Sequence, residues 1–568
     1  MKILFFARHY AYIRLFESSI EELARRGHQL TLSADREESM GGRRMVERLA
    51  ERFPNITLAT TPGRAPGAWS EFARRLRLGI DYLRYLDPRY AATPHIRARA
   101  RERAPRSVVA IADRLGTGAR ETFAHLLRTL ERGIPARADL EGYIASHRPD
   151  AVLVTPLIEL GSQQVDYVKA ARALGIRSAL CVASWDNLTS KGLVRVLPDH
   201  VVVWNEAQKR EAAALHGVPA DCVRVTGAQL FDRWFTTQPS RSREAFCAAV
   251  GLDPAKPFLL YVGSSVFIAP DEVPFAERWL ATLRGAADPA VADVGALVRP
   301  HPANARQWRA FDVSAFENTA LWPPIGTDPT TPGFKADYFD SLYYSAAVVG
   351  INTSAQIEAS IIGRPVFTVR SPEFAHAQDG TLHFKHLVQD GGVVHVAATL
   401  EEHVRQLAGF TAGADAWAVR NRSFVESFIR PHGIDTPVAP RFAAAVTSLV
   451  GEPHPRPRPD PFWVMAARVP ALVVAHMARA LAEGRPLWVY AVRPVVTSGV
   501  WAAAVPYGMG TGWEEHVRPA IKRMRRGVWT AWYESSREMG QQAHRARKRM
   551  MRVVRDARVA ARKTVGPR

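Results

Sequence analysis

The chain has 568 residues, with 75 lysines and arginines against 55 aspartates and glutamates, a formal net charge of +20. This length leaves room for two or three domains, each with a core of its own. Its three cysteines are odd in number and lack metal-ligand spacing, which argues against a disulfide framework and a zinc site and favours a reducing compartment. The apolar start, residues 3–7, is interrupted by Arg8 and His9, so we interpret it as a buried strand and not as a signal peptide.

The N-terminal part of the chain predicts a parallel α/β domain. Short apolar runs alternate with helical patterns, and the expected strands lie at 3–6, 29–33, 151–154, 177–182 and 200–204. An insertion at about 64–137 interrupts this pattern. It is rich in arginine and aromatic residues, and we expect it to be mainly helical and basic.

Three turns of this domain carry polar side chains where a parallel sheet places its active-site groups, at the carboxyl ends of strands. His9 follows the first strand, Glu159 follows the strand at 151–154, and Asp186 lies in the polar loop 183–192. The alternative for His9 is a structural histidine. For the loop it is an Asx-type turn with a packing tryptophan.

A second α/β pattern begins after residues 226–232, TGAQLFD. A strand at 258–262 ends in Gly263-Ser264-Ser265, a turn of small residues that lets backbone N–H groups approach a phosphate. The next strand ends in Arg299-Pro-His301-Pro, which fixes a cation and an imidazole between prolines. Both turns are therefore candidate phosphate-binding segments.

Residues 346–369 carry the strongest single signal. Two apolar runs flank a short helical pattern that opens with Asn352, Thr353 and Ser354 and contains Glu358. The free N–H groups at a helix start bind phosphate, and Ser354 and Glu358, four residues apart, share one helical face. We therefore predict a diphosphate at the helix start and ribose hydroxyls on Glu358. The alternative is an ordinary βαβ unit with a solvated glutamate.

In order along the chain, these segments resemble the B-type glycosyltransferase fold. RPHP at 299–302 is similar to a motif of the teichoic-acid glycerophosphotransferases, and TGAQLFD at 226–232 and the serine, glutamate and Gly-x-Pro pattern at 352–366 also match the UDP-N-acetylglucosamine 2-epimerases. The resemblance implies an α/β protein with two doubly wound parallel-sheet domains facing a cleft. It places an acceptor domain at 1–235 and a nucleotide-donor domain at 236–450. Residues 451–568 lie beyond the resemblance, and we expect them to form a proline-rich linker and a basic helical tail.

The resemblance implies transfer of a sugar, or an alditol phosphate, from a nucleotide diphosphate donor to a hydroxyl of a polysaccharide or lipid-linked acceptor. The acceptor hydroxyl needs a general base, for which His9 and Glu159 come first and Asp186 third. His301 and Arg299 are expected to stabilise the leaving diphosphate, the role of His301 following by analogy. With no Asp-x-Asp motif in a suitable turn, we expect neither a metal nor a cofactor.

Two other functions remain open. One is the chemistry of the resembling families themselves, CDP-glycerol-type phosphotransfer or nucleotide-sugar epimerisation, although the charged catalytic set of the epimerases cannot be mapped onto this sequence. The other is a non-catalytic fold that tethers to a membrane through its tail. The sequence leaves the identity of the sugar, the base and the acceptor undecided.

The tail after residue 450 holds 22 lysines and arginines against 8 acidic residues. Its apolar stretches at 462–476 and 486–506 are broken by arginine and proline, so neither gives the roughly 20 apolar residues that a membrane span requires. Residues 518–568 form a basic, helix-favouring pattern with Trp529 and Trp532, which suits an anionic membrane surface. We expect a cytoplasmic protein that associates peripherally with the inner face of the membrane, and no nucleic-acid partner. The alternatives are a helix on the protein's own acidic face and simple disorder.

This interpretation predicts salt-sensitive binding of the full-length chain to anionic vesicles, because each lysine or arginine near such a surface contributes about 1 kcal/mol of screened attraction. A chain shortened to end near Gly451 should lose vesicle binding and keep nucleotide binding. Vesicle sedimentation at two salt concentrations measures the binding of the full-length and the shortened chain to vesicles. Equal binding to neutral and anionic vesicles, or binding to neither, would contradict the membrane role.

Overall fold

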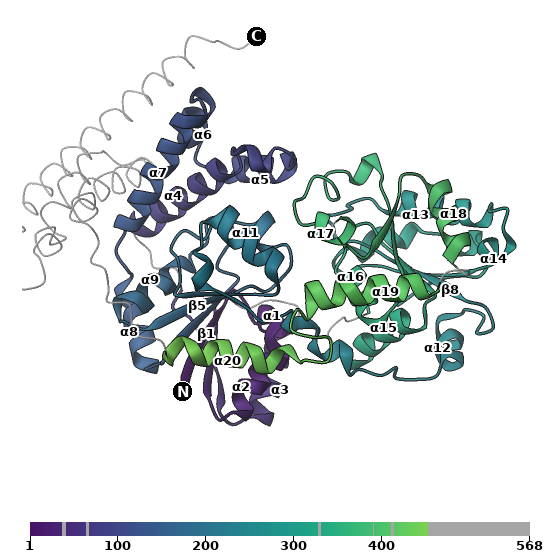
Figure 1. Ribbon diagram of the computed structural model, residues 1–568, viewed down its shortest axis with the longest axis horizontal. Coiled ribbons are helices and arrows are strands. Elements are labelled where there is room, and N and C mark those ends of the chain that lie inside the picture. The colour runs from purple at the N-terminus through teal and green to yellow at the C-terminus, as the bar shows by residue number, and fades with distance from the viewer. Residues whose placement is uncertain (37–40, 64–67, 328–330, 390, 411–413, 452–568) are drawn as a thin grey trace, which may run out of the picture. The chain divides into compact units, whose positions relative to one another are not determined.

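The structure is a computed structural model that describes residues 1–36, 41–63, 68–327, 331–389, 391–410 and 414–451 (Figure 1). The predicted membrane-binding tail therefore lies outside the described residues. Within the described ranges, no helix combines the length and the apolarity needed to cross a membrane.

The first sheet has seven strands in the order β3-β2-β1-β4-β5-β6-β7, and every neighbouring pair is parallel. Its inner strands β1 and β4 are runs of apolar residues buried on both faces, as expected for a sheet covered by helices on each side. The strands are β1 (Lys2–Ala7), β2 (Gln29–Ala34), β3 (Ile56–Thr60), β4 (Ala151–Thr155), β5 (Arg177–Cys181), β6 (His200–Val203) and β7 (Val223–Val225). Its helices are α1 (Tyr10–Ile13), α2 (Glu17–Arg25), α3 (Gly42–Arg52), α8 (Ala138–His147), α9 (Val165–Ala173), α10 (Asn187–Ser190) and α11 (Glu206–His216).

The second sheet has six parallel strands in the order β10-β9-β8-β11-β12-β13. These strands are β8 (Phe258–Val262), β9 (Gly295–Arg299), β10 (Thr319–Leu321), β11 (Ala347–Val349), β12 (Val366–Val369) and β13 (Val394–Ala397). Its helices are α12 (Arg243–Val250), α13 (Val273–Arg284), α14 (Pro289–Ala292), α15 (Pro332–Tyr344), α16 (Ala355–Ile362), α17 (Lys385–Val388), α18 (Leu400–Phe410) and α19 (Ala414–Phe424).

The predicted fold class, two doubly wound parallel sheets, is confirmed. In each sheet the strand order reverses beside the strand that comes first in the chain, between β1 and β4 and between β8 and β11. Loops on the two sides of such a switch point diverge and leave a crevice at the carboxyl ends of the strands. The topology therefore nominates two edges, one in each sheet, for binding.

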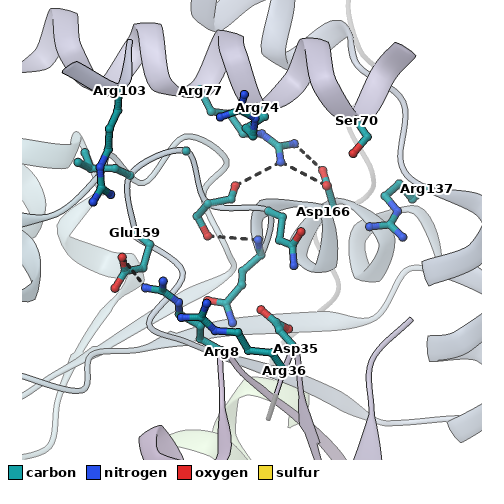
Figure 2. A pocket seen from close by; sticks show the side chains of 15 residues that line it. Arg8, Asp35, Arg36, Ser70, Arg74, Arg77, Arg103, Arg137, Glu159 and Asp166 are labelled. Atoms are coloured by element: carbon teal, nitrogen blue, oxygen red, sulfur yellow. Dashed lines mark hydrogen bonds and ion pairs between the residues drawn. The ribbon is translucent and has the colours of Figure 1, made fainter. Parts of the chain in front are cut away.

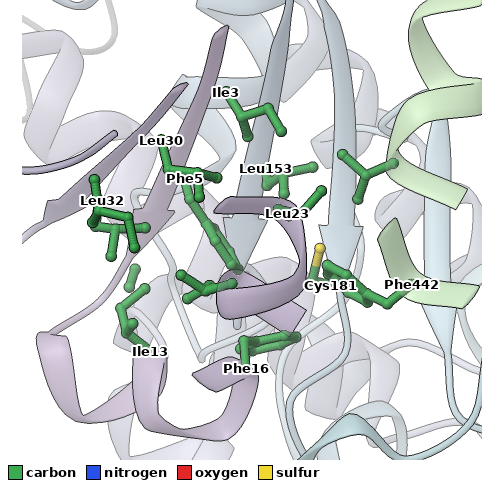
Figure 3. Packing of buried hydrophobic residues seen from close by; sticks show 14 of the residues in the cluster. Ile3, Phe5, Ile13, Phe16, Leu23, Leu30, Leu32, Leu153, Cys181 and Phe442 are labelled. Atoms are coloured by element: carbon green, nitrogen blue, oxygen red, sulfur yellow. The ribbon is translucent and has the colours of Figure 1, made fainter. Parts of the chain in front are cut away.

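The last described helix, α20 (Val438–Gly451), returns to the first sheet (Figure 1). Its buried face joins the core beneath β1 and β5, where Phe442 packs on Phe16 with ring centroids 5.8 Å apart (Figure 3). The chain thus passes from the first sheet to the second and then back again.

Residues 226–232 form the crossing point. Gly227 has φ +106°, and a Cβ at this position would lie 2.6 Å from a methyl of Val438, so the crossing requires glycine. The buried carboxylate of Asp232 accepts hydrogen bonds from the first N–H groups of α20, at Val438 and Ala439, and pairs with Arg430 at 2.8 Å. The motif therefore holds the departing and returning segments together.

The insertion forms helices α4 (Ala68–Arg84), α5 (Pro94–Arg103), α6 (Arg106–Arg114) and α7 (Thr117–Gly133). One face of α4 carries three buried charged residues at helical spacing, Arg77, Asp81 and Arg84. These side chains form hydrogen bonds and ion pairs with two loops of the first sheet, the loop at 156–164 after β4 and the loop at 183–195 after β5.

Each of the three residues makes several contacts with these loops. Asp81 accepts the N–H groups of Gly161 and Leu193, at 2.8 and 2.9 Å, and pairs with the buried Arg195. Arg84 donates to the carbonyl groups of the 183–195 loop, at residues 188, 191 and 192. Arg77 donates to the carbonyl of Ser162 and pairs with Asp166. The insertion is therefore part of the first domain's structure and fixes both loops.

We predict that Asp81→Ala lowers the free energy of unfolding by about 3–5 kcal/mol, because it leaves the Arg195 charge buried without its partner. Arg75→Ala is the matched control on the same helix, since Arg75 forms a half-exposed ion pair with Glu71 that is worth about 1 kcal/mol or less. Denaturant unfolding of both variants measures the difference. Equal costs for the two changes would show that α4 does not hold the loops.

Candidate functional site

Three predicted segments meet at the carboxyl edge of the second sheet. β8 lies between β9 and β11, so the turns that follow these strands, at 263–265, 300–302 and 350–354, are neighbours. The Gly263 N–H donates to the Arg299 carbonyl at 2.9 Å. A Cβ on Gly263 would lie 3.2 Å from the main-chain nitrogen of His301, so this close approach favours glycine.

Ser264 uses its polar groups inside the protein. Its N–H and its hydroxyl both donate to the carboxylate of Glu272, at 2.7 and 3.1 Å, and Tyr261 donates to the same carboxylate at 3.0 Å. Burial raises the pKa of Glu272 to about 7. Of the predicted turn, the half-buried Ser265 remains the residue best placed to meet a ligand, whereas Ser264 braces the turn through Glu272.

Arg299 and Glu358 are linked through Tyr338 in a chain of polar contacts in which Arg299 is buried and the other two residues are partly buried. The Arg299 guanidinium lies over the rings of Phe334 and Tyr338, at 4.9 and 5.2 Å from their centroids, and donates to the Ser341 hydroxyl at 3.0 Å. The Tyr338 hydroxyl in turn donates to Glu358. Burial lowers the pKa of Arg299 to about 10 and raises that of Glu358 to about 7. Tyr338 therefore stands between a buried cation and a carboxyl group that is easily protonated.

His301 caps the short helical segment that follows it. Its Nδ1 accepts the N–H of Ala303 at 3.1 Å. Burial lowers the pKa of His301, so the ring is neutral at neutral pH and carries its proton on Nε2. The imidazole can thus donate a hydrogen bond from Nε2 without being charged.

Side-chain hydrogen bonds hold the segment before α16. The Thr353 N–H donates to the side chain of Gln356 at 3.1 Å, and the buried Asn352 amide donates to the carbonyl of Ala377. Ser354 is exposed. Among the described contacts, neither its N–H nor its hydroxyl has a protein partner. Asn352 and Thr353 therefore shape the helix start, and Ser354 is its exposed residue.

The first sheet brings His9 and Glu159 together at its own switch point. Arg8 pairs with Glu159 at 2.6 Å, the Tyr12 hydroxyl donates to Glu159 at 3.3 Å, and the His9 ring packs on Tyr12 with centroids 4.7 Å apart. Burial raises the pKa of Glu159, but the charges of Lys191 and Arg8 outweigh this effect and hold it below its usual range. Glu159 is therefore ionised and weakly basic.

Asp186 lies in the same polar neighbourhood. It pairs with Lys191 at 3.7 Å and accepts from the Ser190 hydroxyl at 2.9 Å. Burial raises its pKa, but the charges of Lys191 and His383 outweigh burial and lower it below the usual range. Burial also lowers the pKa of His383 to about 4. Lys191 thus stabilises both predicted carboxylates, Glu159 and Asp186.

A pocket of about 260 Å³ lies at this edge (Figure 2). It is bounded by the ends of β1 and β2, the 156–164 loop, and helices α4 and α5. Six arginines and three carboxylates line it: Arg8, Arg36, Arg74, Arg77, Arg103 and Arg137, with Asp35, Glu159 and Asp166. In Figure 2 the arginines of α4 and α5 lie across the pocket from Arg8 and Arg36.

Sequence reasoning found Glu159 and missed most of the charged residues around it. The arginines of the insertion were visible as a basic composition, but their partners lie far away in the chain: Arg77 pairs with Asp166, 89 positions on. Tyr338, which contacts both Arg299 and Glu358, was missed for the same reason. Glu272 had a weak signal, since it lies directly before a Val-Pro helix start. Within the described residues, no group of three or more histidine, cysteine, aspartate or glutamate side chains could hold a metal ion.

Two doubly wound sheets in tandem, with a last helix that returns to the first sheet, form the B-type glycosyltransferase arrangement that the motifs resemble. No family model matches the chain, and no curated protein matches it.

Solved structures do match the chain. A Listeria monocytogenes protein provisionally assigned as a UDP-N-acetylglucosamine 2-epimerase is 13% identical over 80% of this chain and 98% of its own, with a TM-score of 0.46. The UDP-GlcNAc 2-epimerase of Methanocaldococcus jannaschii, in complex with UDP-GlcNAc and UDP, is 12% identical over 79% and 100%, with a TM-score of 0.45. A glycosyltransferase from Rickettsia africae is 8% identical over 80% and 99%, with a TM-score of 0.45. The chain is similar to these proteins in fold, and likeness at this level carries no inference about its reaction.

Proposed function

We propose that this protein is a transferase that moves a sugar, or an alditol phosphate, from a nucleotide diphosphate donor to a hydroxyl acceptor in the synthesis of a cell-surface polysaccharide or glycolipid. The observation that carries this proposal is the second sheet's switch point. There an exposed helix start at Ser354 and a carboxyl group at Glu358 follow β11, and an imidazole donor at His301 follows β9, the two strands on either side of β8.

The donor would be held at two points. The free N–H and hydroxyl of Ser354 suit a phosphate oxygen at the start of α16. Glu358, one turn further along the same face, suits the ribose hydroxyls, which can donate to its carboxylate. Arg299 was expected to contact the leaving diphosphate, but it is buried, stacks on Tyr338 and donates to Ser341. We therefore assign it to supporting Glu358 more than to direct phosphate contact.

The leaving diphosphate would be stabilised by His301. A neutral imidazole with its proton on Nε2 can strengthen its hydrogen bond as charge builds up on the phosphate, without a proton having to be supplied from solvent. The general base remains a prediction among His9, Glu159 and Asp186. The low pKa values of the two carboxylates weaken both as bases, although each is ionised as a base must be.

The first experiment is a thermal-stabilisation screen of the full-length chain with nucleotide diphosphate sugars and CDP-alditols. Binding of a nucleotide sugar followed by transfer supports the proposal. Stabilisation by CDP-alditols alone would favour glycerophosphotransferase chemistry, and interconversion of a free nucleotide sugar without an acceptor would favour epimerisation. Stabilisation by none of them would contradict the donor site.

We predict that Glu358→Ala weakens binding of the stabilising nucleotide about 10- to 100-fold. This loss corresponds to the roughly 1.5–3 kcal/mol that hydrogen bonds to a charged group contribute. The matched control is Glu373→Ala, an exposed acid of the same domain that pairs with Arg278 on the surface. Calorimetric titration compares the two variants. If both variants bind the nucleotide as tightly as the wild type does, Glu358 is not part of the binding site.

The same variant tests the protonation of Glu358. Because burial raises the pKa of this carboxyl from 4.5 to about 7, the stability it contributes is present below pH 4.5 and is lost as the pH rises through 7. Glu358→Gln should therefore flatten the fall in stability between pH 5 and 8. The affinity of the wild type for nucleotide should decrease as the pH falls below 7, and that of Glu358→Gln should not. Identical pH profiles would contradict the raised pKa.

We predict that His301→Ala lowers the turnover number by about 100-fold or more and lowers donor affinity much less, since the interaction strengthens in the transition state. Loss of the cap should also cost about 1 kcal/mol of stability. His301→Ser separates the two effects, because serine can cap the segment but is too short to replace the Nε2 donor. If His301→Ser restores turnover together with stability, the histidine is only a cap.

A further inference from the structure

The arginine-lined pocket of the first sheet is distinct from the predicted donor site. None of the residues predicted to bind the donor lines it. Its volume of about 260 Å³ is small beside the roughly 300–1,000 Å³ of pockets that enclose whole ligands. It is therefore suited to one small charged group of a larger molecule.

One arginine of the pocket is fully committed to the protein. Arg77 donates through all three of its nitrogens to Asp166, Glu131 and the carbonyl of Ser162. Lys169 completes this buried cluster, pairing with Glu131 at 3.0 Å. Asp166 is thereby neutralised, and Arg77 forms part of the pocket's structural floor.

Four other arginines of the pocket have N–H groups that are not used in contacts with the described part of the protein. Arg74 holds Glu71 through Nε and Nη2, and Arg137 holds Asp139 through the same two nitrogens, so in both the Nη1 group is left over. Arg36 and Arg103 are exposed and have no acidic partner among the described residues. These arginines come from a strand end, from α4, from the end of α5 and from the segment before α8.

The remaining carboxylates offset only part of this charge. Glu159 is occupied by Arg8 and Tyr12. Asp35 accepts from the Tyr167 hydroxyl at 2.5 Å, and burial raises its pKa to about 6. The pocket therefore has a positive lining with unused guanidinium donors on more than one side.

We propose that this pocket binds a phosphate or diphosphate group carried by the acceptor, a proposal that rests on the transferase function above. The oxygens of a phosphate group accept hydrogen bonds from several directions at once, as the arginines of this pocket would donate them. A carboxylate needs only one guanidinium group, which pairs with both of its oxygens. Arg8 and Glu159 would place the bound group beside the base candidates at the end of β1, so the acceptor hydroxyl next to the phosphate would reach the reacting centre. The phosphate can belong to a lipid carrier or to a phosphorylated saccharide.

The test is calorimetric titration of the full-length chain with three probes: inorganic pyrophosphate, a short-chain isoprenyl diphosphate and a sugar 1-phosphate. The donor site is first saturated with the nucleotide that stabilises the chain. We expect at least one probe to bind, more weakly as salt rises. The tightest probe identifies the source: the isoprenyl diphosphate points to a lipid-linked acceptor and the sugar phosphate to a saccharide.

Arg36→Ala combined with Arg103→Ala should weaken binding of that probe about tenfold or more, because two charge-assisted contacts are lost. Both residues are exposed, so the double variant should fold. Arg114→Ala, an exposed arginine at the end of α6 outside the pocket, is the matched control and should bind as the wild type does. Nucleotide affinity should be unchanged in both variants.

Failure of every probe to bind the wild type, or unweakened binding by the double variant, would overturn the proposal. The result is independent of the donor site. If no nucleotide binds, the transferase function fails, and titrations without nucleotide still decide whether the pocket takes phosphate. If nucleotide binds and transfer occurs but the double variant keeps its probe affinity, only the pocket assignment fails.

Discussion

The buried charged face of α4 is the interaction on which the first domain's binding edge depends. Loops after parallel strands carry few hydrogen bonds of their own, and here they are held by an insertion that reaches over them with Arg77, Asp81 and Arg84. Burying such charges is unfavourable unless each one is paired and fully hydrogen-bonded. The three residues meet this condition only with the loops in place, so the helix and the loops determine each other's position. Glu159 and Asp186 lie in the two loops that α4 holds, and Arg74 and Arg77 of the pocket lie on α4 itself.

The two switch points are built with opposite electrostatics. At the edge of the first sheet, cations surround the acids and hold Glu159 and Asp186 in the ionised state. At the edge of the second sheet, burial raises the pKa values of Glu272 and Glu358 to about 7, although the tyrosine hydroxyl that donates to each of them acts in the opposite direction. The nucleotide diphosphate that we propose for the second edge would bring its own negative charge, to which the protonation of Glu358 and the helix N–H groups could adjust. The first edge is already positive before any ligand arrives.

The fold was predictable because its signals are local. Apolar runs such as 258–262 and 366–369 follow directly from burial on both faces, and Gly263, directly after the first run, marks a turn from the sequence alone. For the candidate site, the sequence indicated residues that follow a strand, such as Ser354, His301 and Glu159, and their roles stay predictions. What those residues contact could not be read from the sequence. The link from Arg299 through Tyr338 to Glu358 joins positions far apart in the chain, and so does the pairing of Arg77 with Asp166. The return of α20 to the first sheet escaped prediction too, since its apolar face is equally compatible with packing on the second sheet.

That return makes the second domain, in topological terms, a long insertion within the first. Arg26 contacts the carbonyl of Pro440, 414 positions later, and Phe442, Val446 and Leu449 fill the core under β1 and β5. During synthesis from the N-terminus, the seven-stranded sheet is therefore complete long before its core is, and its α2 side stays incompletely covered until the whole second domain has emerged. Contacts this distant in sequence slow folding, because the intervening loop must close before they form. The first domain thus depends on the second for the completion of its own interior, and the two are expected to mature as one cooperative unit.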